Sequence, residues 1–195
     1  MDVRQLVLAT RNAHKLKEFT RLLGPAEVQI EPLPAAVELP PEDGRTFADN
    51  ALPKAQTAAA RTGRAAIADD SGIEADALGG APGVRSARYA GEGASDQENL
   101  EKLIREAPAG SSLRYVCCLA YVDPAAGLQR LFFGECRGRM AATPKGSGGF
   151  GYDPVFIADA TRDGRTMAEL SDQEKDAISH RGNASRALAA WFVGQ

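Results

Sequence analysis

The chain alternates between short apolar runs and amphipathic segments that begin at helix-capping sequences. Three capping sequences begin at Thr46, Ser95 and Ser171. In each of them a Ser or Thr precedes an Asp or Glu by three residues, and the two side chains can bond the free amides at the start of a helix. The apolar runs are typical of buried strands; they span 6–9, 28–30, 65–68, 113–122, 128–139 and 155–157. This alternation predicts a mixed α/β fold.

Local stop signals set the expected ends of the helices. The first helix should end near Leu23, where Gly24 and Pro25 follow, and the last should end near Val193. The helix after Ser95 should bury an apolar face made of Leu100, Leu103 and Ile104. The helix after Ser171 should break near residues 180–182, and strands 113–122 and 128–139 should form an antiparallel hairpin.

Length and charge limit the classes of protein. With 195 residues, of which 44% are hydrophobic and 25% charged, the chain fits one α/β domain spanning residues 1–195. Its net charge of −3 argues against a nucleic acid polymer as partner, because such proteins are usually basic. We expect no partner membrane either, since no run approaches the roughly 20 apolar residues of a membrane span.

The three cysteines and the first residues indicate a cytoplasmic protein. Cys117, Cys118 and Cys136 fit neither a disulfide framework nor a zinc spacing. Neighbouring residues of a strand face opposite sides, so we expect Cys117 and Cys118 to be reduced packing residues. Met1–Gln5 does not resemble the start of a signal peptide.

The first polar cluster follows the first expected strand and spans Thr10–Lys15. Amides at a helix start favour a phosphate, and the side chains here add cations and hydrogen bonds; the residues are Thr10, Arg11, Asn12, Ala13, His14 and Lys15. The alternative is a plain helix cap with solvated cations. The pattern differs from a P-loop, which requires Gly-Lys-Ser/Thr.

The second cluster is Asp69-Asp70-Ser71-Gly72, which directly follows the expected strand 65–68. Two adjacent carboxylates repel each other, and a bound Mg²⁺ would offset that repulsion. A carboxylate beside such an ion can also deprotonate a water. The alternative is a turn in which the aspartates bond backbone amides. Glu42-Asp43 could supply a second metal ligand.

Two further clusters lie in the second half of the chain. In Phe150–Asp153 an aromatic ring and a carboxylate follow a run of glycines, which suits either base binding or a hairpin connection. Lys175, His180 and Arg181 could donate to carbonyl oxygens or phosphates. The alternative is that these cations complement the C-terminal end of a helix.

Taken together, these segments resemble the Ham1/RdgB/inosine triphosphatase family of nucleoside triphosphate pyrophosphatases. The resemblance covers nearly the whole chain and is carried by ordered segments: 8–12 with Lys15 and Glu18, 46–47 with 50–51 and 54–55, 68–72, 78–83 with 86–89, 148–154, and 168–170 through 179–182. It differs at three positions: Arg11 stands where Gly is common, Asp43 where Thr is common, and Asp49 where Glu is common.

The resemblance implies Mg²⁺-dependent hydrolysis of the deaminated purine nucleotides ITP, dITP and XTP to the monophosphate and pyrophosphate, which cleanses the nucleotide pool. It implies a homodimer, and an elongated mixed sheet with flanking helices in two lobes around a central cleft. Asp70 would be the catalytic base and a metal ligand, with Glu42 as second metal ligand. The remaining substrate-binding residues would be Thr10, Arg11, Asn12, Ala13, His14, Lys15, Ser71, Phe150, Gly151, Tyr152, Asp153, Lys175, His180 and Arg181.

Three other interpretations remain open at this point. Ser71, His180 and an aspartate could form a serine hydrolase, although Ser71 lacks the Gly-x-Ser-x-Gly context of that class. A nucleotide sensor would use the same phosphate cluster without Asp70. The related Maf-type pyrophosphatases carry out a similar reaction with other bases.

Overall fold

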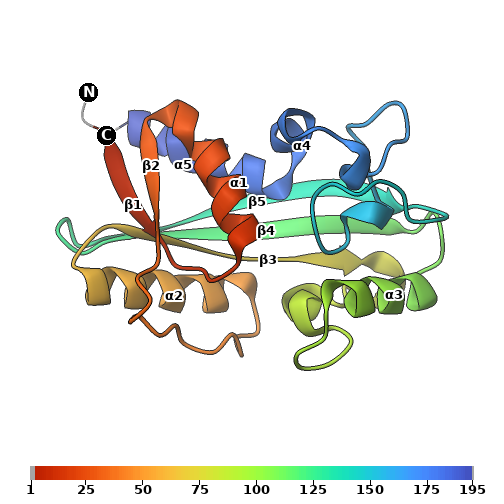
Figure 1. The fold of residues 1–195 in the computed structure, drawn as a ribbon, viewed down its shortest axis with the longest axis horizontal. Helices are drawn as coiled ribbons and strands as arrows, with labels where there is room; N and C mark the ends of the chain where they lie inside the picture. The colour runs from red at the N-terminus through yellow and green to blue at the C-terminus, as the bar shows by residue number, and fades with distance from the viewer. Residues whose placement is uncertain (1–2, 195) are drawn as a thin grey trace. The chain divides into compact units, whose positions relative to one another are not determined.

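Six strands form one mixed sheet in the order β2-β1-β3-β4-β5-β6 (Figure 1). The computed structural model describes residues 3–194. β1 pairs in parallel with β2 and β3, whereas β5 and β6 are antiparallel. The strands are β1 (Arg4–Leu8), β2 (Val28–Pro32), β3 (Ala66–Ala75), β4 (Ser112–Asp123), β5 (Leu128–Met140) and β6 (Phe156–Ala158). The predicted α/β class is therefore confirmed, and the central cleft stays a prediction.

The α-helices match the expected segments closely, and they are α1 (Ala13–Leu23), α2 (Phe47–Thr62), α3 (Asp96–Glu106), α4 (Asp172–Ile178) and α5 (His180–Val193). Both halves of the capping box are present at Thr46, Ser95 and Ser171. None of the helices within residues 3–194 combines the length and the apolar composition needed to cross a membrane.

The chain divides into two compact units. The first comprises residues 1–70, 117–134 and 181–195, and the second comprises residues 71–116 and 135–180. Strands β3, β4 and β5 each have residues in both units. The expectation of one domain over residues 1–195 stays a prediction.

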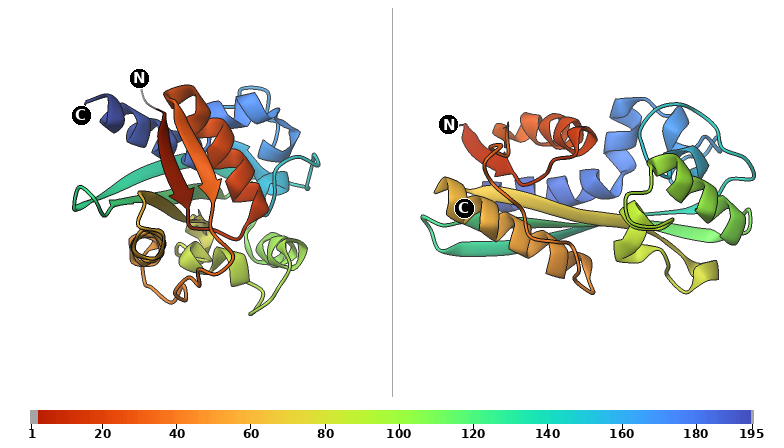
Figure 2. Two further views of the ribbon diagram at one scale, coloured as in Figure 1. Left: turned by 60° about the vertical axis from the view of Figure 1, so that its left-hand side comes forward. Right: turned by 60° about the horizontal axis from the view of Figure 1, so that its bottom comes forward.

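In the first unit, helices cover both faces of the strands. α1 and α5 lie on one face and α2 on the other (Figures 1 and 2). The face under α1 and α5 is a buried apolar cluster that includes Leu8, Phe19, Ile67, Leu119 and Leu188. Alanines form the buried face of α2, and their small side chains let this helix lie close to the strands.

The second unit has its own apolar core. This core includes Ile73, Leu103, Tyr115, Phe156 and Met167. α3 and α4 lie on opposite sides of the strands in this unit (Figure 1).

The predicted apolar face of α3 is only partly correct. Leu100 and Leu103 are buried, but Ile104 is 37% exposed. The buried stripe continues from Leu103 to Ala107, one helical turn further on, so that Ile104 falls at its edge.

The cysteines behave as expected. Cys117, Cys118 and Cys136 are buried free thiols. Burial raises the pKa of the Cys118 and Cys136 thiols to about 12, so they stay protonated at neutral pH.

One local prediction was wrong. The strand expected over 65–68 does not end before the two aspartates, because β3 continues through residues 69–72 between β1 and β4. The break expected near residues 180–182 in the helix after Ser171 is confirmed at Ser179: α4 ends at Ile178, and His180 and Arg181 lie in the first turn of α5. A helix start carries a positive partial charge, so these side chains cannot be explained as cations that complement a helix C-terminus.

Gly72 tests the packing of β3 in the second unit. A Cβ at this position would overlap the carbonyl oxygen of Gly83 and the hydroxyl of Ser86. We therefore expect Gly72→Ala to lower the free energy of unfolding by about 1–3 kcal/mol, measured by urea denaturation. Gly24→Ala is the control, because nothing lies within 4 Å of its Cβ and its φ of −53° suits alanine. Equal stability of the two variants would contradict the close packing at Gly72.

Candidate active site

The carboxyl end of β1 and the two aspartates of β3 lie side by side in the first unit. β1 and β3 are parallel, with Leu8 opposite Ile67, and the Ala9 amide donates to the Ile67 carbonyl at 2.8 Å. The loop that follows β1 therefore starts beside Asp69. Because side chains alternate along a strand, Asp69 faces α1 and α5, as Ile67 does, whereas Asp70 faces α2.

Asp69 is neutralised by two cations. Its carboxylate lies 3.0 Å from Lys15 Nζ and 3.3 Å from Arg181 Nε. Arg181 also bonds Glu18 at 3.1 Å, and Glu18, Asp69 and Arg181 are all buried. A buried charge is tolerated when it is paired, so side chains of α1 and α5 offset the charge of Asp69.

Asp70 lies in a different environment on the other face of β3. It is 5% exposed, and Asn50 Nδ2 donates to its Oδ2 at 2.8 Å. Lys54, one turn further along α2, donates to the Asp69 carbonyl oxygen at 2.7 Å and forms an ion pair with Glu42. Burial raises the pKa of Asp70 to about 6, against smaller lowering effects of Asn50 and Lys54.

The side chains around Asp70 fit a hard divalent cation. Asp70 and Glu42 supply carboxylate oxygens, and the two are close enough that the charge of Glu42 helps raise the pKa of Asp70. Residues 3–194 hold no group of three or more Asp, Glu, His or Cys side chains that could bind a metal. Mg²⁺ is commonly held by one or two carboxylates together with substrate phosphates and water, so this donor set suits Mg²⁺.

The segment Thr10–Lys15 starts α1 with a conventional cap. Asn12 is the N-cap, and its Oδ1 accepts from the amides of His14 and Lys15 at 2.8 and 3.2 Å. The Thr10 hydroxyl accepts from the Asn12 amide at 3.1 Å. Three of the amides expected to bind phosphate are therefore already bonded within the segment. Lys15 contributes its charge directly beside Asp69.

Arg11 is the exception in this segment. Its guanidinium donates to backbone carbonyls of residues 33–37. The side chain thus connects the start of α1 to the loop after β2.

A second cluster forms around Asp153 in the second unit. Lys175 Nζ and the Phe150 amide donate to its Oδ2 at 2.7 and 2.9 Å, and the Tyr115 hydroxyl donates to its Oδ1 at 3.2 Å. The Tyr115 ring stacks on the His180 ring, with centroids 4.6 Å apart. Asp153, Lys175 and His180 are each at most 4% exposed.

The remaining expected site residues of the second unit are Gly151, Tyr152 and Ser71. The Gly151 amide donates to Asp96 at 3.2 Å, and the Tyr152 hydroxyl donates to the Ser86 carbonyl at 2.7 Å. Ser71 is half-buried within β3, not on the sharp turn that a nucleophilic serine requires.

The structure therefore groups the expected residues by unit. In the first unit, Lys15 and Arg181 bond Asp69, and Glu42 lies near Asp70 on the other face of β3. In the second unit, Asp153 bonds Lys175 and the Phe150 amide, and His180 stacks on Tyr115. The roles of these residues as ligands of a substrate or metal stay predictions.

The residues that sequence reasoning did not assign are the supporting partners Glu18, Asn50, Lys54 and Tyr115. For Asn50 and Lys54 the sequence contains a usable signal. The two are four residues apart on the helix face that otherwise buries alanines, where a polar residue needs a partner.

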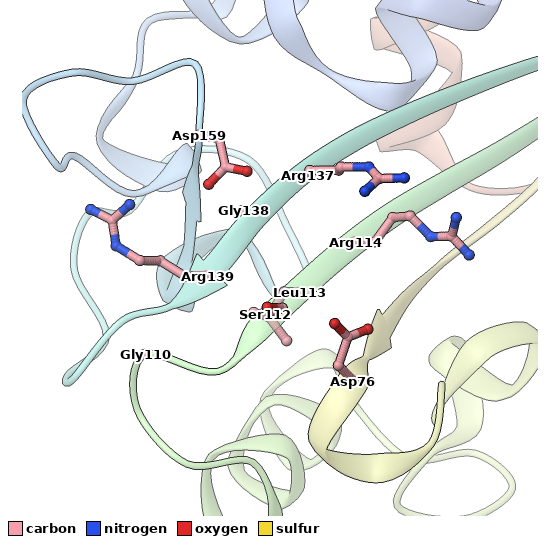
Figure 3. Close-up of a pocket in the computed structure, with 9 residues that line it drawn as sticks. All are labelled: Asp76, Gly110, Ser112, Leu113, Arg114, Arg137, Gly138, Arg139 and Asp159. Carbon is pink, nitrogen blue, oxygen red and sulfur yellow. The ribbon is translucent and has the colours of Figure 1, made fainter.

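A cavity of about 560 Å³ lies elsewhere in the second unit. Its charged lining residues, drawn in Figure 3, are Arg114, Arg137, Arg139, Asp76 and Asp159. Arg114 forms ion pairs with Glu74 and Glu135. Because carboxylates balance the arginines, this cavity does not single out an anionic ligand.

Comparisons with family models, with curated proteins and with solved structures all lead to the same family. A model of the Ham1 family matches residues 6–191. The dITP/XTP pyrophosphatase of Symbiobacterium thermophilum is 49% identical over 194 residues, 97% of this chain and 93% of that protein. The structure of a HAM1 protein from Coxiella burnetii superposes with a TM-score of 0.86 at 38% identity, covering 98% of this chain and all of that one. The Staphylococcus aureus Ham1 protein superposes with a TM-score of 0.83 at 35% identity, covering 98% of this chain and 99% of that one.

The raised pKa of Asp70 has a consequence for stability. The folded state binds the proton more tightly than the unfolded state, whose carboxyl titrates near 3.8. The ionisation of Asp70 therefore lowers the free energy of unfolding as pH rises from about 4 to about 6. At pH values above that range the whole of this destabilisation is present. In EDTA at pH 7 we expect Asp70→Asn to be more stable than the wild type by on the order of 2 kcal/mol, with the difference shrinking toward pH 4.

Asp69→Asn is the matched control for this measurement. It leaves Lys15 and Arg181 without the carboxylate that neutralises them, so we expect a loss of about 3 kcal/mol in the free energy of unfolding. If urea denaturation gave the two variants the same sign at pH 7, the assignment of different environments to the two aspartates would be wrong.

Proposed function

The chain belongs to the Ham1 family, and we propose that it hydrolyses the deaminated purine nucleotides ITP, dITP and XTP to the monophosphate and pyrophosphate. Such an enzyme is a nucleoside triphosphate pyrophosphatase. The observation that carries the proposal is that two adjacent buried carboxylates have different bonding partners. Asp69 is paired with Lys15 and Arg181, whereas Asp70 bonds a neutral amide.

Asp70 is the proton acceptor of the reaction. Its carboxylate is held by Asn50 and therefore has a fixed orientation toward a water placed for attack on the α-phosphorus. Proton transfer to a positioned carboxylate makes such a water a better nucleophile. Asp70 and Glu42 would hold Mg²⁺, which when bound neutralises charge that develops on the phosphate oxygens.

Lys15, in the first turn of α1, binds the phosphates. Lys15 already lies at the carboxyl end of β1, where ligands of α/β sheets usually bind. Its ammonium rests on Asp69 in the free protein, so it is held in position before a phosphate arrives. Such preorganised charge costs little reorganisation during the reaction.

The cluster around Asp153 binds the base. A 6-oxo purine presents an acceptor at position 6 and a donor at position 1, whereas adenine presents the reverse. Lys175 and His180 can donate, and Asp153 can accept. With adenine, the 6-amino donor would face the donors Lys175 and His180, and this mismatch is the basis for rejection.

The same family membership supports three further proposals. The enzyme acts as a homodimer, it works on the nucleotide pool of the cytoplasm, and its partners are small nucleotides rather than nucleic acid polymers. The net charge of −3 agrees with the last of these, because polymer binding usually needs a basic surface.

A nucleotide panel tests the substrate class. We expect pyrophosphate release from ITP, dITP or XTP to exceed that from ATP by at least about 100-fold in kcat/KM, since the donors of the base cluster cannot pair with adenine. The reaction should stop in EDTA and return with Mg²⁺. Equal rates for ITP and ATP would contradict the assignment of the base cluster, and hydrolysis of other bases alone would indicate a Maf-type preference.

A pair of neighbouring substitutions tests the catalytic base. Asp70→Asn should reduce kcat for ITP by about 10²–10⁴-fold, because an amide cannot take the proton. Ser71→Ala, in the next residue of β3, should keep kcat within about 10-fold of the wild type and serves as the control. The reverse result, an active Asp70→Asn and an inactive Ser71→Ala, would favour a serine nucleophile. Circular dichroism confirms that each variant is folded.

A further inference from the structure

We propose that Arg11 is a positioning residue for the loop that carries Glu42, and that its side chain does not bind the phosphates of the nucleotide. The proposal rests on the proposed function in one respect, since Glu42 matters as a metal ligand there. It assigns to Arg11 a different role from the substrate contact expected from its place between β1 and α1.

The hydrogen bonds of Arg11 carry the proposal. Its Nη1 donates to the Leu33 carbonyl at 2.9 Å. Its Nη2 donates to three further carbonyls, those of Pro34, Ala35 and Val37, at 2.9, 3.1 and 2.7 Å. Both terminal nitrogens of the guanidinium therefore face the loop backbone. The same edge of the group is not available for the bidentate contact with a phosphate that makes arginine a phosphate ligand.

The carbonyls that Arg11 binds belong to a tight turn outside the sheet. The Val37 amide donates to the Pro34 carbonyl at 3.1 Å, and Leu33 and Val37 are buried at the two ends of the turn. Because this segment is neither helix nor strand, its carbonyls need donors from elsewhere. Arg11 supplies them from a single side chain.

The far end of the same loop is fixed beside Asp70. Glu42 pairs with Lys54, and the Gly44 amide donates to Asn50 Oδ1 at 2.8 Å. Pro40 and Pro41 lie between the turn and Glu42, and each proline restricts its own φ. A stiff connection of this kind transmits a displacement of the turn to Glu42.

Arginine is well suited to this role. Its planar guanidinium has several donors in fixed directions, whereas a lysine ammonium is a compact point charge that cannot span several carbonyls of one turn. Arg11→Lys therefore keeps the charge and loses the geometry. Arg11→Met keeps most of the stem and loses both.

Three measurements on Arg11→Lys and Arg11→Met test the proposal. The Val37 and Gly44 amides, which are hydrogen-bonded to the Pro34 carbonyl and to Asn50 Oδ1, should exchange hydrogen at least about 10-fold faster than in the wild type, because fewer bonds hold the loop. The Mg²⁺ concentration for half-maximal ITP hydrolysis should rise by about 10-fold, the size of effect seen when support of a metal ligand is lost. At saturating Mg²⁺ the KM for ITP should stay within about 2-fold. Lys17→Met, which removes an exposed cation of α1, is the control for charge alone.

Each possible outcome bears on the proposal. Faster exchange with an increased Mg²⁺ requirement and an unchanged KM supports it, most strongly when Arg11→Lys behaves as Arg11→Met does. An increased KM with unchanged exchange would overturn it and make Arg11 a phosphate ligand. Faster exchange with an unchanged Mg²⁺ requirement would overturn the connection to Glu42. If the wild type hydrolysed no nucleotide, the proposed function would fail, while hydrogen exchange would still decide whether Arg11 holds the loop.

Discussion

The pairing of Asp69 with Lys15 and Arg181 is the interaction on which the first unit depends. A bare carboxylate at the centre of a sheet would cost several kcal/mol, so β3 can run through residues 69–72 only because cations reach it from α1 and α5. Glu18 completes the group by pairing with Arg181. Helices α1 and α5, which are far apart in the sequence, are thereby both bonded to β3 at the residue next to Asp70.

Local signals were sufficient to predict the fold class and most element boundaries. The capping boxes at Thr46, Ser95 and Ser171 depend only on residues three apart, and all three are present. The continuity of β3 could not be predicted in the same way. A sequence of two aspartates, serine and glycine is typical of a turn, and only pairing with β1 and β4 makes it a strand.

The sequence indicated which residues belong to the candidate site more readily than it indicated which charged side chains form ion pairs there. The sequence assigned Lys15, Asp70 and Glu42 to the site, and the structure places Lys15 beside Asp69 and Glu42 near Asp70, while their roles stay predictions. The partners Glu18 and Lys54 were not assigned, because a helix face shows that a side chain is buried but not which distant group it meets. Arg11 illustrates the same limit: a cation beside a helix start suits a phosphate and a row of carbonyls equally well in sequence, and the geometry distinguishes the two.

The glycine-rich segment before Asp153 has a physical reason of its own. Gly149 has a φ of +67°, and a Cβ there would overlap the Asp153 carboxylate. The backbone thus wraps closely around a carboxylate that already accepts bonds from Lys175, Tyr115 and the Phe150 amide. These three donors hold the Asp153 carboxylate in one orientation, as Asn50 holds Asp70 in the first unit. The Asp153 carboxylate is therefore fixed before any ligand arrives. In the base site proposed above, a fixed acceptor of this kind distinguishes one purine edge from another because it cannot rearrange to suit both.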